Sequence, residues 1–113
     1  MPKRKLGRKA GPRRALLRSQ VTALLKEEKI TTTEAKARDV RKEAEKMISL
    51  AKKGDLHSRR RALSYILDED VVYKLFEKLG PRMEARDGGY TRMTRAGYRR
   101  GDGAPLVVLE LVV

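Results

Sequence analysis

The sequence predicts an α+β fold, a two-layer domain in which helices cover one small sheet. Apolar residues recur at spacings of three and four between positions 13 and 79, as in helices that bury one face. Turn clusters rich in Gly, Asp and Pro separate strand-like runs within residues 90–113, which indicates a C-terminal hairpin. A β-branched run at 30–33 can add another strand. We expect the order helix, strand, three helices, two strands, with a small mixed or antiparallel sheet packed under the helices and a basic N-terminal extension.

Length, charge and cysteine content limit what the chain can be. Its 113 residues suffice for one domain, and its net charge of +13 favours a polyanionic partner. There is no cysteine, so disulfides and thiolate metal sites are excluded. We find neither an apolar signal segment nor a run long enough to cross a bilayer, and we expect a cytosolic protein.

The first eleven residues are basic and contain almost nothing apolar. Such a segment cannot bury enough surface to offset the entropy of ordering it, so it is either a frayed terminus or an arm that orders along a phosphate backbone. The absence of acidic residues before Glu27 favours the arm. We therefore divide the chain into an arm at 1–11 and one domain at 12–113, with the hairpin at 90–113.

The first expected helix spans 13–28, and Pro12 suits the position where it begins. Its apolar stripe packs on the core, whereas the arginines at its start continue the charge of the arm. The stripe consists of Leu17, Val21, Leu24 and Leu25.

The next helix, at 34–53, follows the expected strand at 30–33. Thr33 can cap its start and Gly54 can end it, since glycine tolerates the left-handed conformation that often closes a helix. The residues expected on its buried face are Ala37, Val40, Ala44, Met47, Ile48 and Ala51.

A shorter helix is expected at 55–67, capped by Asp55 or Ser58, with Leu63, Ile66 and Leu67 turned inward. Its first turn carries Arg59, Arg60 and Arg61, where the helix dipole disfavours cations. These arginines form either a solvated face or a set of phosphate contacts, and we favour phosphate contact for at least one of them. The lone histidine, His57, is more typical of a surface or phosphate-contact residue than of a catalytic base.

The last expected helix opens at Asp68 and ends at Gly80-Pro81. Its buried stripe consists of Val71, Val72, Leu75, Phe76 and Leu79. The three consecutive acids at 68–70 could imitate a metal site, but they point in different directions, so helix capping explains them better.

The hairpin follows a polar connection at 82–89. Strand alternation places Tyr90 and Tyr98 on the same side as Arg92, where aromatic and guanidinium planes suit exposed RNA bases and sugars. Packing of the tyrosines beneath the helices is the alternative, and for Tyr98 the two possibilities are equal. The final strand at 106–113 is too apolar to be solvated on either face, so we expect both faces to be covered.

The sequence contains no recognisable catalytic arrangement. It has one histidine, no Gly-rich phosphate loop between a strand and a helix, and serines only within expected helices. A metal-free ribonuclease built on His57 is the best enzymatic alternative, and we do not favour it. We expect no enzyme activity, cofactor, metal site or small-molecule substrate.

A nucleic acid is therefore the expected partner. A membrane surface fits less well, because the cations do not lie on an amphipathic helix with aromatic anchors. An extended arm beside an arginine-lined hairpin suits irregular folded RNA slightly better than DNA, although a nucleoid-type DNA-binding protein remains the alternative.

Several motifs resemble the bacterial large ribosomal subunit protein seventeen family, in the same order and over essentially the whole chain. The most specific are GGYTR at 88–92 and RRGDGAP at 99–105. Similar segments are KRKLGR at 3–8, RALLR at 14–18, TTTEAKA at 31–37, AKKGDLHSRR at 51–60, KLF at 74–76, GPR at 80–82 and LELV at 109–112. Family members commonly carry histidines where this chain has Lys3 and, approximately, Arg13-Arg14, so we transfer the role of the arm but not its detailed contacts.

The resemblance implies a structural constituent of the large ribosomal subunit that binds large-subunit rRNA near the polypeptide exit tunnel. It also implies the two-layer fold, an N-terminal extension laid into rRNA, neighbouring ribosomal proteins as partners and a cytoplasmic location in the ribosome. We expect the free protein to be monomeric. The residues expected to contact RNA are Lys3, Arg4, Lys5, Arg8, Lys9, Arg13, Arg14, Arg18, Arg59, Arg60, Arg61, Tyr90, Arg92, Arg95, Tyr98, Arg99 and Arg100.

Overall fold

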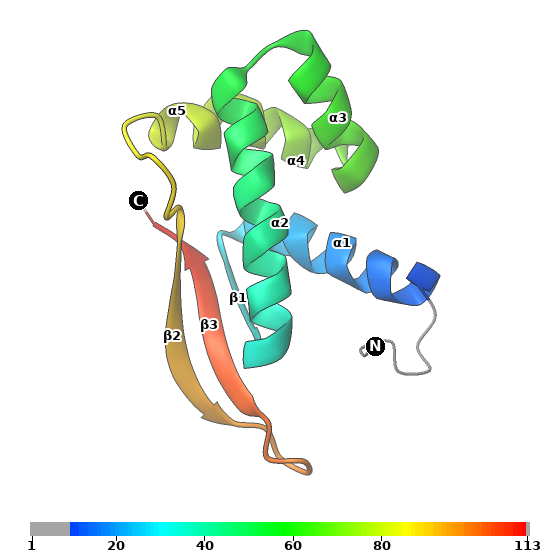
Figure 1. Cartoon of the computed structure of the whole chain (residues 1–113), viewed down its shortest axis with the longest axis vertical. Coiled ribbons are helices and arrows are strands. Elements are labelled where there is room, and N and C mark those ends of the chain that lie inside the picture. The colour runs from blue at the N-terminus through cyan, green and yellow to red at the C-terminus, as the bar shows by residue number, and fades with distance from the viewer. Residues whose placement is uncertain (1–9, 113) are drawn as a thin grey trace.

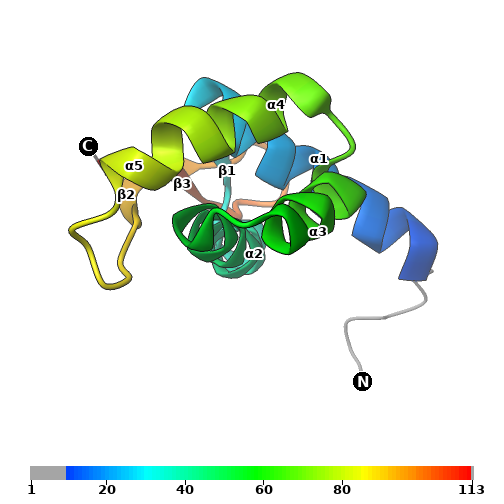
Figure 2. The ribbon, with the colours of Figure 1, turned by 90° about the horizontal axis from the view of Figure 1, so that it is seen from above.

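Helices and strands follow one another along the chain in the predicted order. The structure, a computed structural model, describes residues 10–112 (Figure 1). Its elements are α1 (Ala10–Glu27), β1 (Lys29–Thr33), α2 (Glu34–Lys53), α3 (Leu56–Ile66), α4 (Glu69–Lys74), η2 (Leu75–Leu79), α5 (Gly80–Arg82), β2 (Thr91–Tyr98) and β3 (Pro105–Leu111). Segments α4, η2 and α5 run on without a break as one helix, which lies alongside α2 and α3 (Figure 2).

The sheet is antiparallel throughout, with β3 between β1 and β2. Helices cover the face that carries Val107, Leu109 and Leu111, all of which are buried. The core between the helices and this face includes Val21, Leu24 and Leu25 of α1, the six predicted residues of α2 and the five predicted residues of the last helix. The α+β prediction and these three apolar stripes are confirmed.

The expectation that both faces of the last strand are covered is wrong. On the helix-free face Leu106, Val108 and Glu110 are only half-buried. Because β3 is the central strand, its neighbours on each side shield it: Thr31 and Thr94 flank Val108 in the register. On this face, polar side chains of β1 and β2 shield the central strand, and within residues 10–112 no second layer of helices covers it.

Local capping chemistry sets the bounds of α2, which agree with the prediction. The Thr33 hydroxyl oxygen accepts a hydrogen bond from the Lys36 N–H at 3.4 Å. At the other end Gly54 is left-handed, with φ of 71°, and its N–H donates to the Leu50 carbonyl at 3.1 Å. By contrast α1 begins at Ala10, three residues before the prediction, because the first turn of a helix needs no internal N–H donors and so admits Pro12.

Helix α3 is capped by Asp55, whose carboxylate accepts from the Ser58 N–H at 2.7 Å. Ile66 is buried and Leu63 half-buried as expected, but the inward placement of Leu67 is wrong. Leu67 occupies the left-handed C-cap position with φ of 63°, which turns its side chain away from the helix face, and 68% of the residue is exposed. Asp68 then caps α4 by accepting from the N–H groups of Asp70 and Val71, so the capping interpretation is confirmed.

The prediction that Gly80-Pro81 ends the last helix is wrong, since both residues are helical. The helix widens into a π-helical turn at Leu75–Leu79, in which the Gly80 N–H donates to the Leu75 carbonyl. Pro81 then stands in the first turn of α5, where its missing N–H is tolerated. The extended helix brings Met83 into the core, where it is fully buried.

The junction between α1 and β1 is held by one carboxylate. Glu28 accepts two hydrogen bonds from the Arg82 guanidinium, at 2.6 and 3.2 Å, and pairs with the Lys74 ammonium at 3.0 Å. The Arg82 hydrogen bond lowers the pKa of Glu28 from 4.5 to about 2, with Lys74 contributing less. Glu28 therefore joins α1 to both α4 and α5.

We expect the Glu28→Gln variant to lose about 1 kcal/mol of unfolding free energy at pH 7. Without screening, the pKa shift of Glu28 would correspond to about 3 kcal/mol. Because 33% of the Glu28 side chain is exposed, water screens its ion pairs with Arg82 and Lys74 and reduces this contribution. Because the folded pKa is lowered, this contribution is complete above pH 4.5 and disappears as the pH falls toward 2. Urea unfolding at several pH values measures it. A variant–wild-type difference that stays constant down to pH 2, or an equal loss in Glu27→Gln, would contradict the assignment.

Candidate nucleic-acid interface

Arginines lie at the surface of several elements, and two of these places are the start of α1 and the hairpin formed by β2 and β3. In Figure 1 the strands β2 and β3 lie on one side of α2 and the start of α1 on the other, and the hairpin turn extends past the start of α2. Within residues 10–112, four arginines here form no salt bridge. They are Arg13, Arg14, Arg95 and Arg100, which we call the basic set.

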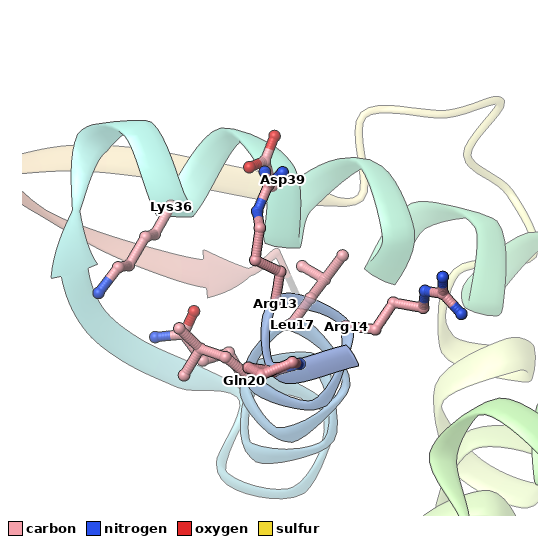
Figure 3. Close-up of a pocket in the computed structure, with 8 residues that line it drawn as sticks. Arg13, Arg14, Leu17, Gln20, Lys36 and Asp39 are labelled. Carbon is pink, nitrogen blue, oxygen red and sulfur yellow. The ribbon is translucent and has the colours of Figure 1, made fainter. Parts of the chain in front are cut away.

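The starts of α1 and α2 enclose a shallow hollow of about 460 Å³. Arg13, Arg14 and Lys36 contribute three cations to its lining, and Asp39 contributes one acid (Figure 3). Arg14 points away from Arg13, so the two guanidinium groups face different directions. The hollow is open and cationic, which suits a phosphate backbone better than a small neutral ligand. Lys36 was not among the predicted contacts, because its place beside α1 depends on the packing of α1 against α2.

Arg18 differs from the other arginines of α1 because it packs on the protein itself. Its guanidinium lies over the Tyr65 ring, 5.3 Å from the centroid. The Arg18 Nε and the Tyr65 hydroxyl are buried and have no hydrogen-bond partner among residues 10–112. Arg18 therefore links α1 to α3 and presents less of its charge outward than Arg14 does.

A β-bulge changes which side chains of β2 share a face. The register passes from Arg95 opposite Val107 to Gly97 opposite Leu106, with Gly97 at φ of 106°. The extra residue moves Tyr98, opposite Pro105, to the face that carries Arg95. The predicted grouping of Tyr98 with Arg92 is therefore wrong. Tyr98 is 68% exposed, so its ring is open to solvent rather than packed beneath helices.

The hairpin turn is fixed by Asp102. Its carboxylate accepts from the Arg99 guanidinium at 2.6 and 3.2 Å and from the Ala104 N–H at 3.1 Å. These bonds, the Arg99 side chain first, keep the pKa of Asp102 well below its usual range. Arg99 thus supports the shape of the turn, and the adjacent Arg100 is left exposed.

Tyr90 lies in the core, with 5% of its surface exposed. The Lys52 ammonium donates to its hydroxyl at 2.9 Å and lies 5.1 Å from the ring centroid, and it also donates to the Arg86 carbonyl. The prediction that Tyr90 is exposed beside Arg92 is therefore wrong. This tyrosine anchors the loop after α5 to the end of α2.

Other predicted contacts are partly engaged by acids. Arg92 pairs with Glu110 across β2 and β3, which lowers the pKa of that carboxyl. Arg59 pairs with Glu77 at 2.9 Å and lies over the Phe76 ring. Arg60 and Arg61 are exposed and form no salt bridge within residues 10–112. The five cations predicted for the arm, Lys3, Arg4, Lys5, Arg8 and Lys9, lie outside the described residues.

Within the part of the chain that the structure describes, no three His, Asp or Glu side chains are placed to hold a metal ion. No helix in the same range is long and apolar enough to cross a membrane. His57 is exposed at the start of α3.

Comparison with known proteins identifies close relatives. The family model described as ribosomal protein L17 matches residues 16–112. A protein named large ribosomal subunit protein bL17, from Caldanaerobacter subterraneus subsp. tengcongensis, is 63% identical and covers 99% of this chain and 100% of its own. Proteins of the same name from Moorella thermoacetica and Syntrophomonas wolfei are 60% and 54% identical, each over 99% of this chain and 100% and 99% of their own.

Proposed function

The chain belongs to the ribosomal protein L17 family, and from that premise we propose that it binds large-subunit rRNA through the basic set and the N-terminal arm. It is a structural constituent of the bacterial large ribosomal subunit and not an enzyme, and it works in the cytoplasm as part of the translating ribosome.

One observation supports the rRNA proposal above all others. Arg13, Arg14, Arg95 and Arg100 project from two separate elements, and no acid within residues 10–112 pairs with them. Unpaired surface cations in a chain of net charge +13 repel one another, and phosphate relieves that repulsion. Tyr98 beside Arg95 adds an exposed ring on which an unpaired base can stack.

Within this proposal the predicted contacts other than Arg60 and Tyr90 divide into three groups. The basic set, Tyr98 and the five arm cations bind rRNA directly. Arg92 and Arg99 hold the hairpin in shape through Glu110 and Asp102, and Arg18 and Arg59 pack on aromatic rings. Arg61 is a further phosphate contact. Tyr90 is omitted because it is buried.

The position in the subunit is also a proposal. The family resemblance of the motifs at 88–92 and 99–105 supports a site near the polypeptide exit tunnel, with neighbouring ribosomal proteins as further partners. We propose that the protein is monomeric before assembly. A cross-linking map of assembled large subunits tests the site, and contacts confined to rRNA far from the tunnel would refute it.

The rRNA proposal is tested by the salt dependence of binding. We expect Arg100→Gln to lower the slope of log K against log salt by about 0.7 to 0.9, because one phosphate contact is lost. Lys78→Gln, an exposed cation on the helix remote from the hairpin turn, is the matched control and should leave the slope unchanged. Deletion of residues 1–11 should reduce the slope by more than Arg100→Gln does, and it should weaken incorporation into large subunits. Equal affinity for duplex DNA and rRNA at physiological salt would instead favour the general DNA-binding alternative.

A further inference from the structure

A second groove lies between α3 and α4, at the end of the long axis opposite the hairpin turn (Figure 1). It measures about 450 Å³. Leu56 and Leu63 line it from α3 and Tyr73 from α4, with Arg60 on one side and Glu69 and Asp70 on the other. The groove thus has an apolar lining between one cationic and one anionic border.

Exposed apolar side chains line this groove. Within residues 10–112 five large apolar side chains are exposed, and two of them, Leu56 and Tyr73, line the groove, while Leu67 lies in the connection between α3 and α4. The inward faces of these helices are already filled by Ala62 and Ile66 of α3 and by Val71 and Val72 of α4. The fold therefore does not require Leu56 and Tyr73, which are 63% and 57% exposed. A clustered set of exposed apolar side chains is typical of a contact surface.

The groove is held in shape before anything binds. The Asp55 cap fixes the first turn of α3, where Leu56 stands. Arg59, beside it, pairs with Glu77 at 2.9 Å and lies over the Phe76 ring. These contacts tie α3 to the helix that carries Tyr73, so an occupant meets a preformed surface.

The charges select the class of occupant. Glu69 and Asp70 are exposed and form no salt bridge within residues 10–112, so a phosphate backbone laid in the groove would meet two carboxylates. Of the two arginines that line the groove, Arg59 is already paired with Glu77, so a phosphate would find only Arg60 to offset the two carboxylates. A protein segment can instead bury an apolar side chain against Tyr73 and Leu56 and place a cation beside Glu69 and Asp70.

We propose that the α3–α4 groove docks a segment of a neighbouring large-subunit protein that presents a lysine or arginine beside an apolar side chain. This inference rests on the proposed function and divides the molecule: the end with the hairpin turn contacts rRNA, and the α3–α4 end contacts protein. Arg60, predicted as a phosphate contact, then pairs with an acid of the docked segment.

The chain lacks cysteine, which makes a site-specific test direct. Tyr73→Cys, Leu67→Cys and Tyr98→Cys variants are labelled with a maleimide that carries a diazirine, a group that reacts with protein and RNA alike. Each is reconstituted into large subunits, irradiated, and its cross-linked partner identified by mass spectrometry. Leu67 is the matched control, because it is as exposed as Tyr98 but does not line the groove.

We expect the Tyr73 label to cross-link to one neighbouring subunit protein, at a peptide with a cation beside an apolar residue, and the Tyr98 label to cross-link to rRNA. Adding Glu69→Lys and Asp70→Lys should lower the Tyr73 cross-link at least fivefold and leave the Tyr98 cross-link unchanged. Leu67 should give the same protein more weakly or no product.

Three results overturn the inference while the proposed function stands. They are a Tyr73 cross-link to rRNA, a cross-link to a second copy of this chain, or no cross-link, each with the Tyr98 label still on rRNA. The inference is also overturned if the Tyr73 cross-linking yield is unchanged by Glu69→Lys and Asp70→Lys. If the protein fails to co-sediment with large subunits, or the Tyr98 label does not reach rRNA, the proposed function fails and this inference fails with it.

Discussion

Replacing the whole basic set by glutamine is expected to weaken rRNA binding on the order of a hundredfold at 0.2 M salt. The variant carries Arg13→Gln, Arg14→Gln, Arg95→Gln and Arg100→Gln. Each lost phosphate contact lowers the salt slope by about 0.7 to 0.9, so the slope should fall by about three to four. The affinity loss should shrink as the salt concentration rises, because counterion release then contributes less.

The fold should survive these four changes. None of the four arginines forms a salt bridge within residues 10–112; Arg14, Arg95 and Arg100 are exposed and Arg13 is half-buried. The turn keeps its shape because the Arg99–Asp102 pair is untouched. Urea unfolding should therefore differ from wild type by no more than about 0.5 kcal/mol, and a loss of binding cannot be attributed to unfolding.

A charge-matched control separates position from net charge. Four cations on the part of the molecule remote from the hairpin turn are replaced by glutamine, which gives the same change in net charge. These are Lys46, Lys53, Lys78 and Arg86. Filter binding of a large-subunit rRNA fragment at several salt concentrations compares the two variants. If both lose affinity equally, the basic set has no special role and the interface proposed here is wrong.

Sequence periodicity predicts the helices well because short-range chemistry determines them. In α2 the Thr33 cap, the left-handed Gly54 and the six buried residues are all local features, spaced as a helix requires. The pairing of β2 with β3 also follows, since a hairpin places the two strands side by side. Pairing of β1 with β3 depends on tertiary packing, and the sequence indicates only that β1 is a strand.

The hairpin shows where strand alternation fails as a guide to a binding face. One extra residue between Arg95 and Gly97 reverses the facing of everything after it. Gly97 adopts a φ that favours glycine, and that glycine was the available signal for the bulge. Tyr98 consequently joins Arg95, and the aromatic contact moves to the other face of the hairpin.

Ion pairs between residues far apart in the sequence also cannot be predicted from the sequence alone. Arg59 and Glu77 are 18 residues apart, as are Arg92 and Glu110, so their ion pairs depend on packing. The sequence predicts the contact cations as a class but cannot separate those that hold the fold from those left for a partner. Among the predicted arginines that the structure describes, that separation leaves the basic set, Arg60 and Arg61 without a salt bridge or an aromatic contact.

The sequence predicts that Gly80 ends a helix, but the contact that requires a glycine at this position is with α2, elsewhere in the chain. A Cβ at this position would lie 3.0 Å from the Ala51 carbonyl oxygen and 3.1 Å from the Ala51 carbonyl carbon and Cβ. Gly80 is helical and has no left-handed φ, so it does not terminate the helix. Its role is to let α5 approach the backbone of α2, a requirement that only the packed structure reveals.

We therefore expect Gly80→Ala to lower the unfolding free energy by about 2 kcal/mol. Alanine favours helix over glycine by about 0.5 to 1 kcal/mol, but here the added methyl meets backbone atoms that cannot rotate away. Either α2 and α5 separate or the last turn of α2 distorts, and the fully buried Met83 and Leu79 lose contacts in both cases. The steric cost should exceed the gain in helix propensity.

Gly11→Ala in the first turn of α1 is the matched control, because no atom lies within 4 Å of the Cβ it would add. That change should be neutral or slightly stabilising. Urea unfolding of both variants at pH 7 measures the difference. Equal stability of the two variants would mean that the approach of α5 to Ala51 relaxes freely, and the packing role assigned to Gly80 would then be wrong. A lower midpoint for Gly80→Ala with unchanged rRNA affinity of the folded protein would show that this glycine supports the scaffold and not the interface.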